Sequence, residues 1–391
     1  MNRQSHRSAL RAIAVAGVTI GSLSAGVAAA GSASANNGPR VDFHRGVLTI
    51  TGTNGDDALV VGRDVNGVIT LNDTPLYVRG VQPTVANVQL IEIDGKRGND
   101  GISISEVNGT MPPVDANGGA GDDRIAGGSA NDVLEGGSGN DQLFGNGGSD
   151  TLLGGSGDDT LFGGTGNDVM KGGEGNDQLV WNPGDGSDVV RGGRGNDTLL
   201  FNGANVAETM TLTPNGSGAT LFRNVGNVTM DIAGTETVQI KARGGADSTT
   251  VGDLSGTDVR TVQIADGDGA DLAADTVVVN GTEAAENISV VANPDGGVEV
   301  QGLHTVVDVA ATDGPLDTLQ VNALGGDDVV DASRLPAGIV TFSADGGDGN
   351  DVLEGSAGDD HLVGGNGDDI LVGNAGFDTL DGGPGNNVLS Q

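Results

Sequence analysis

The chain has 391 residues, no cysteine and 72 glycines, and its 54 acidic residues against 18 basic ones give a formal charge of −36. This charge excludes a duplex nucleic-acid binder, which needs a cationic surface, and the lack of cysteine excludes disulfides and thiolate metal sites. Hydrophobic residues make up 36% and aromatic residues 2%, so we expect a thin, layered fold rather than a thick globular core.

Residues 1–35 have the pattern of a secretory signal peptide. A basic start with three arginines precedes an apolar stretch of small residues, and Ala33-Ser34-Ala35 then gives an A-x-A cleavage site. Glycines and hydroxyl residues interrupt the apolar stretch, which makes a retained membrane anchor the weaker alternative. We therefore predict export with cleavage, and we expect no membrane span in the rest of the chain.

Residues 41–117 contain the first of three long, weak repeats, and residues 201–345 contain the other two. Each repeat has an NGT-like turn, an acidic residue, alternating strands and a second glycine–acid turn. Valine, isoleucine and threonine alternate with polar residues, a period of two that indicates strands. We predict an all-β solenoid that continues through these segments; a separate small sandwich for each repeat is the alternative.

A nine-residue repeat fills residues 118–200 and returns in residues 346–390. Typical units are GGSGNDQLF and GGTGNDVMK, with glycine at positions one, two and four, aspartate at six and a large apolar residue at eight. Glycine permits the positive φ of a tight turn, and a lone apolar residue between polar neighbours indicates a three-residue, half-buried strand. No unit can bury its own apolar residue. We therefore expect two units per coil, stacked with the apolar residues inside and the aspartates outside.

The stacked aspartates create an electrostatic problem. Like charges about 5 Å apart repel by roughly 3 kcal/mol per pair at an effective dielectric of ~20, and the block has few basic residues. The available ligands are carboxylates and glycine carbonyls, and flexible oxygen-only sites favour Ca²⁺ over zinc or magnesium. A disordered Gly/Asp-rich tail is the alternative, but disorder does not need an apolar residue at every ninth position.

These units resemble the repeats-in-toxin (RTX) family, whose haemolysin-type calcium-binding nonapeptide is GGxGxDxUx with U large and apolar. The resemblance covers about a third of the chain. It implies a parallel β-roll that holds calcium between adjacent turns. It also implies that the position-six aspartates are the side-chain ligands, namely Asp123, Asp132, Asp141, Asp150, Asp159, Asp168, Asp177, Asp188, Asp197, Asp351, Asp360, Asp369 and Asp378.

Some units depart from this pattern. Asn387 replaces the last aspartate, which predicts a weak or absent terminal site. Asn146 and Asn374 replace second glycines, where asparagine tolerates positive φ. Phe377 is expected to cover the end of the stack, and Pro183, which follows a two-residue insertion, is expected to mark a bulge.

The turns of the weak repeats contain further acids, which are either calcium ligands or, as is more usual for single turn acids, only solvated. The run from Asp266 to Asp271 has the start of an EF-hand loop, but Val277 stands where a glutamate is needed, so we favour a plain acidic loop. The inner acids of the turns are Asp56, Asp57, Asp100, Asp247, Asp327 and Asp328.

Catalytic motifs such as HExxH, GxSxG and the P-loop do not occur in the sequence, and the histidines outside the leader are far apart. We therefore predict a secreted, extracellular, non-catalytic calcium-binding protein with a structural or adhesive role. Such a role implies a partner on a cell surface or in a matrix, which the sequence does not specify.

The alternative function is a hydrolase or polysaccharide lyase with its active site on the β-rich segments. Residues 65–83, which contain Tyr77 and Arg79, are the first place to look for it, because this region has the most varied side chains. A pore-forming toxin is a third possibility, but it needs a hydrophobic inserting region that the sequence lacks.

Overall fold

The computed structural model describes residues 38–265, 273–310 and 314–391, and residues 38–391 form one compact unit. The predicted signal peptide at 1–35 and the acidic run at 266–271 lie outside the described residues. Within the described residues the only helical elements are two 3₁₀ turns, η1 (Val225–Asn227) and η2 (Gly314–Leu316), and all other elements are strands. The structure therefore confirms the all-β prediction.

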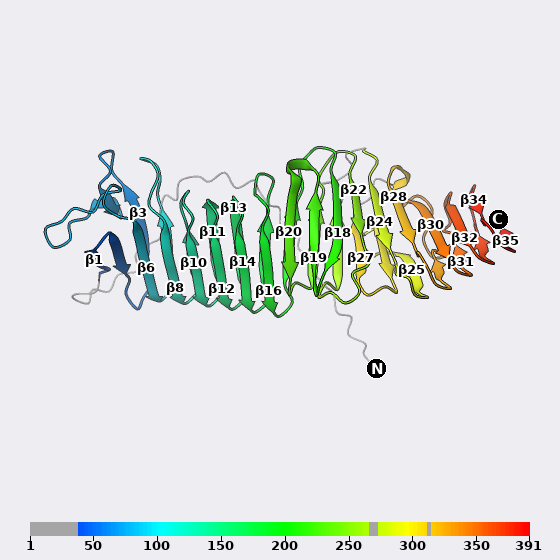
Figure 1. The fold of residues 1–391 in the computed structure, drawn as a ribbon, viewed down its shortest axis with the longest axis horizontal. Coiled ribbons are helices and arrows are strands. Elements are labelled where there is room, and N and C mark those ends of the chain that lie inside the picture. Colours follow the sequence, from blue (N-terminus) through cyan, green and yellow to red (C-terminus); the bar gives the residue numbers. More distant parts are fainter. Residues whose placement is uncertain (1–37, 266–272, 311–313) are drawn as a thin grey trace. The chain divides into compact units, whose positions relative to one another are not determined.

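The strands form two sheets, and consecutive strands of the nonapeptide blocks alternate between them (Figure 1). The first sheet contains, in spatial order, β1 (Arg40–His44), β2 (Val47–Thr51), β6 (Leu90–Arg97), β8 (Val114–Ala120), β10 (Val133–Ser138), β12 (Thr151–Ser156), β14 (Val169–Glu174), β16 (Val189–Arg194), β20 (Val228–Ala233), β19 (Gly218–Arg223), β18 (Thr209–Asn215), β22 (Ser248–Val251), β24 (Thr276–Asn280), β28 (Thr318–Asn322), β30 (Thr341–Asp348), β32 (His361–Asn366) and β34 (Thr379–Asp381). The second sheet contains β5 (Thr74–Pro75), β4 (Ile69–Leu71), β3 (Ala58–Arg63), β7 (Gly101–Ile104), β9 (Arg124–Ala126), β11 (Gln142–Gly147), β13 (Thr160–Thr165), β15 (Gln178–Trp181), β17 (Thr198–Asn202), β21 (Thr237–Lys241), β23 (Thr261–Ala265), β27 (Val306–Ala310), β26 (Val298–Gln301), β25 (Asn287–Ala292), β29 (Val329–Asp331), β31 (Val352–Glu354), β33 (Ile370–Val372) and β35 (Val388–Ser390).

Two nonapeptides make one coil, as predicted. Leu134 pairs in parallel with Leu152 on the first sheet, and Leu143 pairs with Leu161 on the second. Strands β9, β31, β33, β34 and β35 have the predicted three residues. Others, such as β12, are longer, because the chain stays extended through positions one to three of the following unit. The turn between strands is correspondingly shorter than six residues.

The core is a double row of the position-eight side chains. Each of them is fully buried in the first block, because the two sheets face each other across this row. The buried residues are Ile125, Leu134, Leu143, Leu152, Leu161, Met170, Leu179, Val190 and Leu199.

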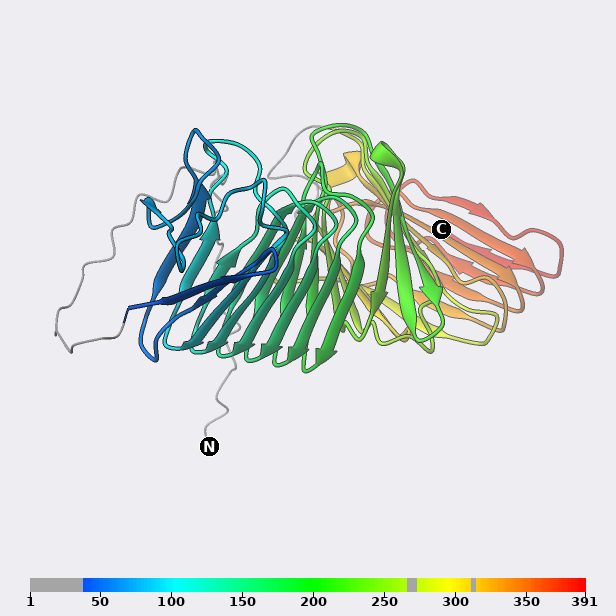
Figure 2. The same ribbon diagram turned by 60° about the vertical axis from the view of Figure 1, so that its left-hand side comes forward.

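The weak repeats continue the same solenoid, so the sandwich alternative is wrong. Leu199 pairs in parallel with Val238, and Val321 pairs with Ala344, so the ladders cross from the blocks into the segment between them. This segment also contains two antiparallel meanders, which the sequence did not predict: β18–β19–β20, drawn in green in Figure 2, and β25–β26–β27. The meanders occupy places in the sheets that single strands occupy elsewhere.

The structure also tests two local predictions, the bulge at Pro183 and the covering of the end of the stack by Phe377. Of the two inserted residues before Pro183, Trp181 lengthens strand β15 and pairs with Phe201, and Asn182 begins the turn. The spacing between stacked aspartates grows there from 18 to 20 residues, while the strands on both sides stay paired. Phe377 does not cover the end of the stack. Its side chain is 90% exposed, because position five points away from the core.

Candidate metal centre

The position-six aspartates are buried, except for the half-buried Asp378, and the prediction that they face outward is wrong. The side chain of Asp159, for example, is 1% exposed and lies over its own turn. The reason is that the backbone N–H groups of the turns have no partner in the strand ladders, and a buried N–H needs an acceptor. The carboxylates supply that acceptor.

One carboxylate oxygen of each aspartate links neighbouring coils. The backbone N–H of Asp123 donates to Oδ1 of Asp141 at 2.7 Å, that of Asp141 to Asp159 at 2.8 Å, and that of Asp159 to Asp177 at 2.9 Å. The same bond recurs on the other face, where Asp150 donates to Asp168. The aspartates of each face therefore form a continuous row along the stack.

Position five forms a second row that runs in the opposite direction. The backbone N–H of Asn140 donates to Oδ1 of Asp122 at 2.9 Å, and that of Asp158 donates to Oδ1 of Asn140 at 2.9 Å. Position-six side chains thus accept from the preceding coil and position-five side chains from the following coil. The sequence analysis missed this row, although the recurrence of Asp, Asn or Ser at position five was the available signal.

The second carboxylate oxygen distinguishes two kinds of turn. In Asp132 and Asp360 it accepts the backbone N–H of position two of the same turn, from Gly128 at 2.7 Å and Ser356 at 2.6 Å. We call these closed turns. In the other eleven predicted ligands Oδ2 is buried and has no hydrogen-bond partner, and we call their turns open: Asp123, Asp141, Asp150, Asp159, Asp168, Asp177, Asp188, Asp197, Asp351, Asp369 and Asp378.

The free oxygen of an open turn faces other oxygens. A Cβ added to Gly154 would stand 2.4 Å from Oδ2 of Asp159 and 2.6 Å from the carbonyl oxygen of Gly172 on the next coil. Glycine is required there because a side chain would displace both oxygens. Two acceptors thus converge on one point with no donor between them.

In the last turn an asparagine supplies the hydrogen-bond donor that the aspartate turns lack. Asn387 replaces aspartate there, and its Nδ2 donates to the carbonyl oxygens of Gly382 at 2.6 Å and Gly383 at 2.9 Å. Its Oδ1 still accepts from the backbone N–H of Asp369, so the row is intact. An amide donor therefore fills the place that in the aspartate turns requires a proton or a cation.

Burial raises the pKa of the position-six carboxyl groups in the first block. The pKa of Asp159 rises to about 7, first because the group is desolvated and then because Asp141, Asp177 and Asp158 add negative charge. The pKa of Asp188 rises to about 8 for the same reasons, with Asp168 and Asp185 as the neighbours. A charged carboxylate in these turns is costly at neutral pH unless a cation accompanies it.

The donor set fits a hard cation. It consists of carboxylate and backbone carbonyl oxygens, which are the ligands that Ca²⁺ takes in variable number and geometry. Side chains alone do not suffice, since among the described residues no three acidic or histidine side chains gather into a metal-binding group. The backbone carbonyls of the glycine turns must therefore contribute.

The inner acids of the weak repeats belong to the same rows. Asp57 donates its backbone N–H to Oδ1 of Asp100, and Asp100 donates to Oδ1 of Asp123. Asp328 likewise donates to Asp351, while Asp56 and Asp327 sit in position-five rows. The sequence analysis missed further members, namely Glu208, Asp275, Glu286 and Asp317.

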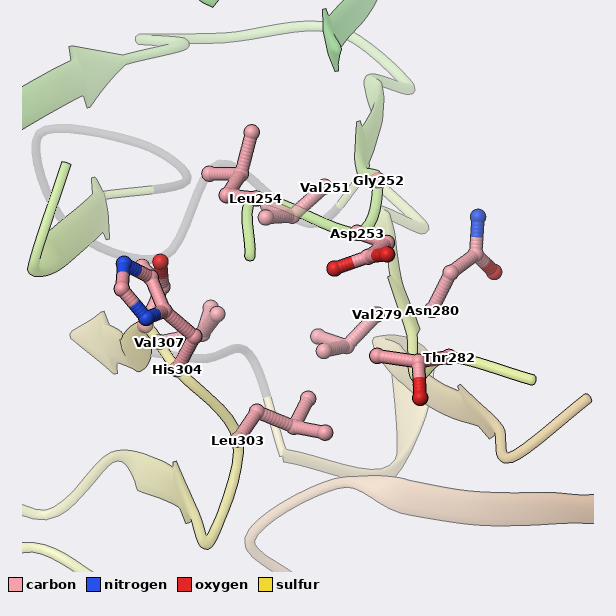
Figure 3. Close-up of a pocket in the computed structure, with 11 residues that line it drawn as sticks. Val251, Gly252, Asp253, Leu254, Val279, Asn280, Thr282, Leu303, His304 and Val307 are labelled. Carbon is pink, nitrogen blue, oxygen red and sulfur yellow. The ribbon is translucent and has the colours of Figure 1, made fainter. Parts of the chain in front are cut away.

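The region suggested first for an active site is exposed, and a cavity in the middle segment is very small. Tyr77 is 70% exposed, and Arg79 forms only a surface ion pair with Asp42 at 3.4 Å. A cavity of about 20 Å³ lies between strands of the middle segment, lined by side chains that include Leu254, Val279 and His304 (Figure 3). This volume holds about one water molecule, far less than the hundreds of Å³ of a small-molecule site.

The comparison with protein families agrees with the geometry. The RTX calcium-binding nonapeptide repeat, a pattern of four copies, matches residues 117–152, 144–179, 184–203, 345–380 and 363–390, together about a third of the chain. No curated protein matches the sequence. The family match confirms the resemblance seen in the sequence and the expectation of calcium.

Proposed function

We propose that this chain, an RTX-type calcium-binding repeat protein, is a secreted, non-catalytic scaffold with a structural or adhesive role. We further propose that the position-six aspartates of its open turns are the side-chain ligands of calcium. The observation that carries this proposal is the series of buried Oδ2 atoms that have no hydrogen-bond partner. A calcium ion beside each of them supplies the missing positive charge.

Calcium binding is then coupled to folding. The open turns bring carboxylates and carbonyls together only in the stacked state, so calcium binds the folded chain in preference to the unfolded one. Such a ligand stabilises the folded state by about 2.7 kcal/mol per site at a hundredfold excess over its Kd. Because each aspartate row links successive coils, we expect the sites to act cooperatively.

The chemical equivalence of the turns supports a non-catalytic role. Catalysis depends on a few groups in individually tuned environments. The most perturbed carboxyl groups of this chain repeat one environment from coil to coil, and burial is the first cause of the raised pKa in each. This pattern is typical of a repeated binding motif.

Secretion rests on the pattern of the first 35 residues. No helix among the described residues has the length and apolar character needed to cross a membrane. The test is expression of the full chain in a host with a general secretory pathway, followed by N-terminal sequencing of the exported product. We expect the product to begin at Asn36; an uncleaved product held in the membrane fraction would contradict secretion.

The central experiment is a far-ultraviolet circular dichroism titration of the chain from residue 36 onward. We expect β-structure to form on addition of calcium, to disappear with chelator, and to form poorly with magnesium at the same concentration. A spectrum that chelator leaves unchanged would falsify calcium-coupled folding. Turnover of protein, ester or polysaccharide substrates by the calcium-loaded chain, lost on changing Tyr77 or Arg79, would overturn the non-catalytic role.

A further inference from the structure

The backbone at position two separates open from closed turns. In open turns this residue has positive φ, for example 116° at Gly155 and 72° at Asn146. Its N–H then does not donate to Oδ2, which stays without a partner. In the closed turns of Asp132 and Asp360, the residue at position two does not have positive φ, and its N–H donates to Oδ2 of the aspartate.

The turn Gly95–Asp100, which lies outside the matched repeats, has the open form. In the turn Gly95–Asp100, position two is Lys96, a residue with a side chain that nevertheless has a φ of 87°. Asp100 is 2% exposed, and its Oδ2 has no hydrogen-bond partner. A buried carboxylate oxygen is thus left unpaired here as it is in the nonapeptide turns.

Oδ2 of Asp100 has the same surroundings as Oδ2 of the aspartates in the open nonapeptide turns. A Cβ added to Gly95 would stand 2.4 Å from Oδ2 of Asp100 and 2.4 Å from the carbonyl oxygen of Gly118 on the next coil. The nearest lysine does not neutralise the site, because the Lys96 ammonium pairs with Asp94 at the surface. The two oxygens therefore lack a positive partner from the protein.

We infer that the turn Gly95–Asp100 is a further calcium site, and that the closed turns of Asp132 and Asp360 are not sites although they lie within the matched repeats. The inference rests on the proposed function of the open turns. The row of calcium sites that contains Asp123 then extends by one coil, to Asp100. It ends there, because in the preceding turn the N–H of Thr53 donates to Oδ2 of Asp57 and closes the turn.

Asp328 does not carry the same inference. Its Oδ2 is also buried without a partner, and Leu324 at position two has a φ of 78°. Position one, however, is Ala323, where the turn of Asp100 and the open nonapeptide turns other than that of Asp188 have glycine. In the turn of Asp100 position one is Gly95, so no side chain stands beside Oδ2 of Asp100 and the carbonyl oxygen of Gly118.

The test compares three asparagine variants of the full chain, D100N, D159N and D132N. Asparagine preserves the hydrogen-bond row, because Asn387 in the last turn still accepts the N–H of Asp369. Each variant is stripped with chelator, reloaded with calcium and desalted, and its bound calcium per chain is measured by elemental analysis. We expect D100N and D159N each to bind less calcium than wild type, and D132N to bind as much.

The other outcomes are distinguishable. A loss in D159N but not in D100N overturns this inference and leaves the proposed function standing. No loss in either variant refutes the proposed function itself. A loss in D132N equal to that in D159N refutes the distinction between open and closed turns.

A second measurement needs no variant. A crystal of the wild-type chain grown with Tb³⁺ in place of calcium should show an anomalous peak beside Oδ2 of Asp100, as beside Asp159, and none beside Asp132. Peaks in the nonapeptide block without one at Asp100 would overturn the inference even if D100N failed to fold.

Discussion

The first nonapeptide block, residues 118–200, and the segment after it, residues 201–345, contain the same rows of acidic side chains. They differ in what pairs with the second carboxylate oxygen of each acid. In the block the second carboxylate oxygen has no protein partner, except in the closed turn of Asp132. In the segment two of the corresponding acids are glutamates, Glu208 and Glu286, and they accept N–H groups from Ala204 at 3.0 Å and Thr282 at 3.1 Å, whereas Oδ2 of Asp328 has no partner. At the two glutamate turns the segment therefore supplies its own donors.

The segment also supplies its own positive charge and a larger core. Arg223 Nε donates to Oε1 of Glu208 at 2.6 Å, and both side chains are buried. Strands such as β21 and β28 bury two apolar side chains each, where β12 buries Leu152 and a glycine. Since a buried aliphatic side chain contributes roughly 1.5–3 kcal/mol, these strands gain more from apolar burial than the strands of the block, for which we propose calcium as the missing stabilising partner.

Removal of calcium should separate the two regions most strongly. With chelator, we expect amide hydrogen exchange to become fast across residues 118–200, while strands of the middle segment such as β21 and β28 keep most of their protection. Hydrogen exchange with mass spectrometry measures both regions in one sample. Uniform loss of protection would show that the segment depends on the block, and unchanged protection would contradict the need for calcium.

Arg223→Ala should damage the segment in a way that calcium does not repair. It leaves Glu208, which is fully buried, without its cation, at a cost of about 3–5 kcal/mol. The matched control is Arg194→Ala, because the Arg194–Glu174 pair is exposed and its loss costs about 1 kcal/mol or less. Urea unfolding in saturating calcium gives both values, and equal values would refute the assignment of an internal cation.

Within the blocks, Asp159→Ala should weaken calcium binding more than Asp378→Ala. Asp159 is linked to Asp141 on one side and to Asp177 on the other, whereas Asp378 is linked to Asp360 and lies near the end of the second block. We expect a larger fall in stoichiometry and in cooperativity for Asp159→Ala in a calcium titration. Equal effects would indicate independent sites rather than a coupled row.

Acid should partly replace calcium in the block. Burial raises the folded-state pKa of Asp150 and Asp159 to about 7, above the value of about 3.9 expected in the unfolded chain. The folded state then binds more protons between these values, so metal-free stability is greatest at low pH and falls as pH rises from about 4 to about 7. Circular dichroism in chelator should show more β-structure at pH 5 than at pH 7.5, and the opposite order would contradict the raised pKa.

Lys96→Gly should give the smallest effect, a stabilisation of about 1 kcal/mol, because a side chain at positive φ is strained. The control is Lys171→Gly in strand β14, where glycine should destabilise, since no positive φ is required there. Thermal unfolding with calcium present compares the two. Destabilisation by both changes would show that the Lys96 side chain is needed for reasons other than its backbone conformation.

Much of this protein was predictable from the sequence because its pattern is periodic. The apolar residue at position eight recurs in fixed phase, which specifies strands, two units per coil and a core of residues such as Leu152. The excess of aspartate and glycine, with no cysteine, similarly specifies oxygen ligands and hence calcium. These properties depend on composition and spacing, which a sequence contains in full.

The tertiary structure decided how each aspartate is used. The unit of Asp132 has glycine at position two, yet its turn is closed; its position four is Ala130, where open turns have glycines such as Gly139 with a φ of 125°. The unit around Asp100 lacks that second glycine and is open. The inward direction of the carboxylates follows from turn N–H groups that only the neighbouring coil can satisfy. Such bonds join residues 18 or more positions apart, so they exist only once the coils are stacked.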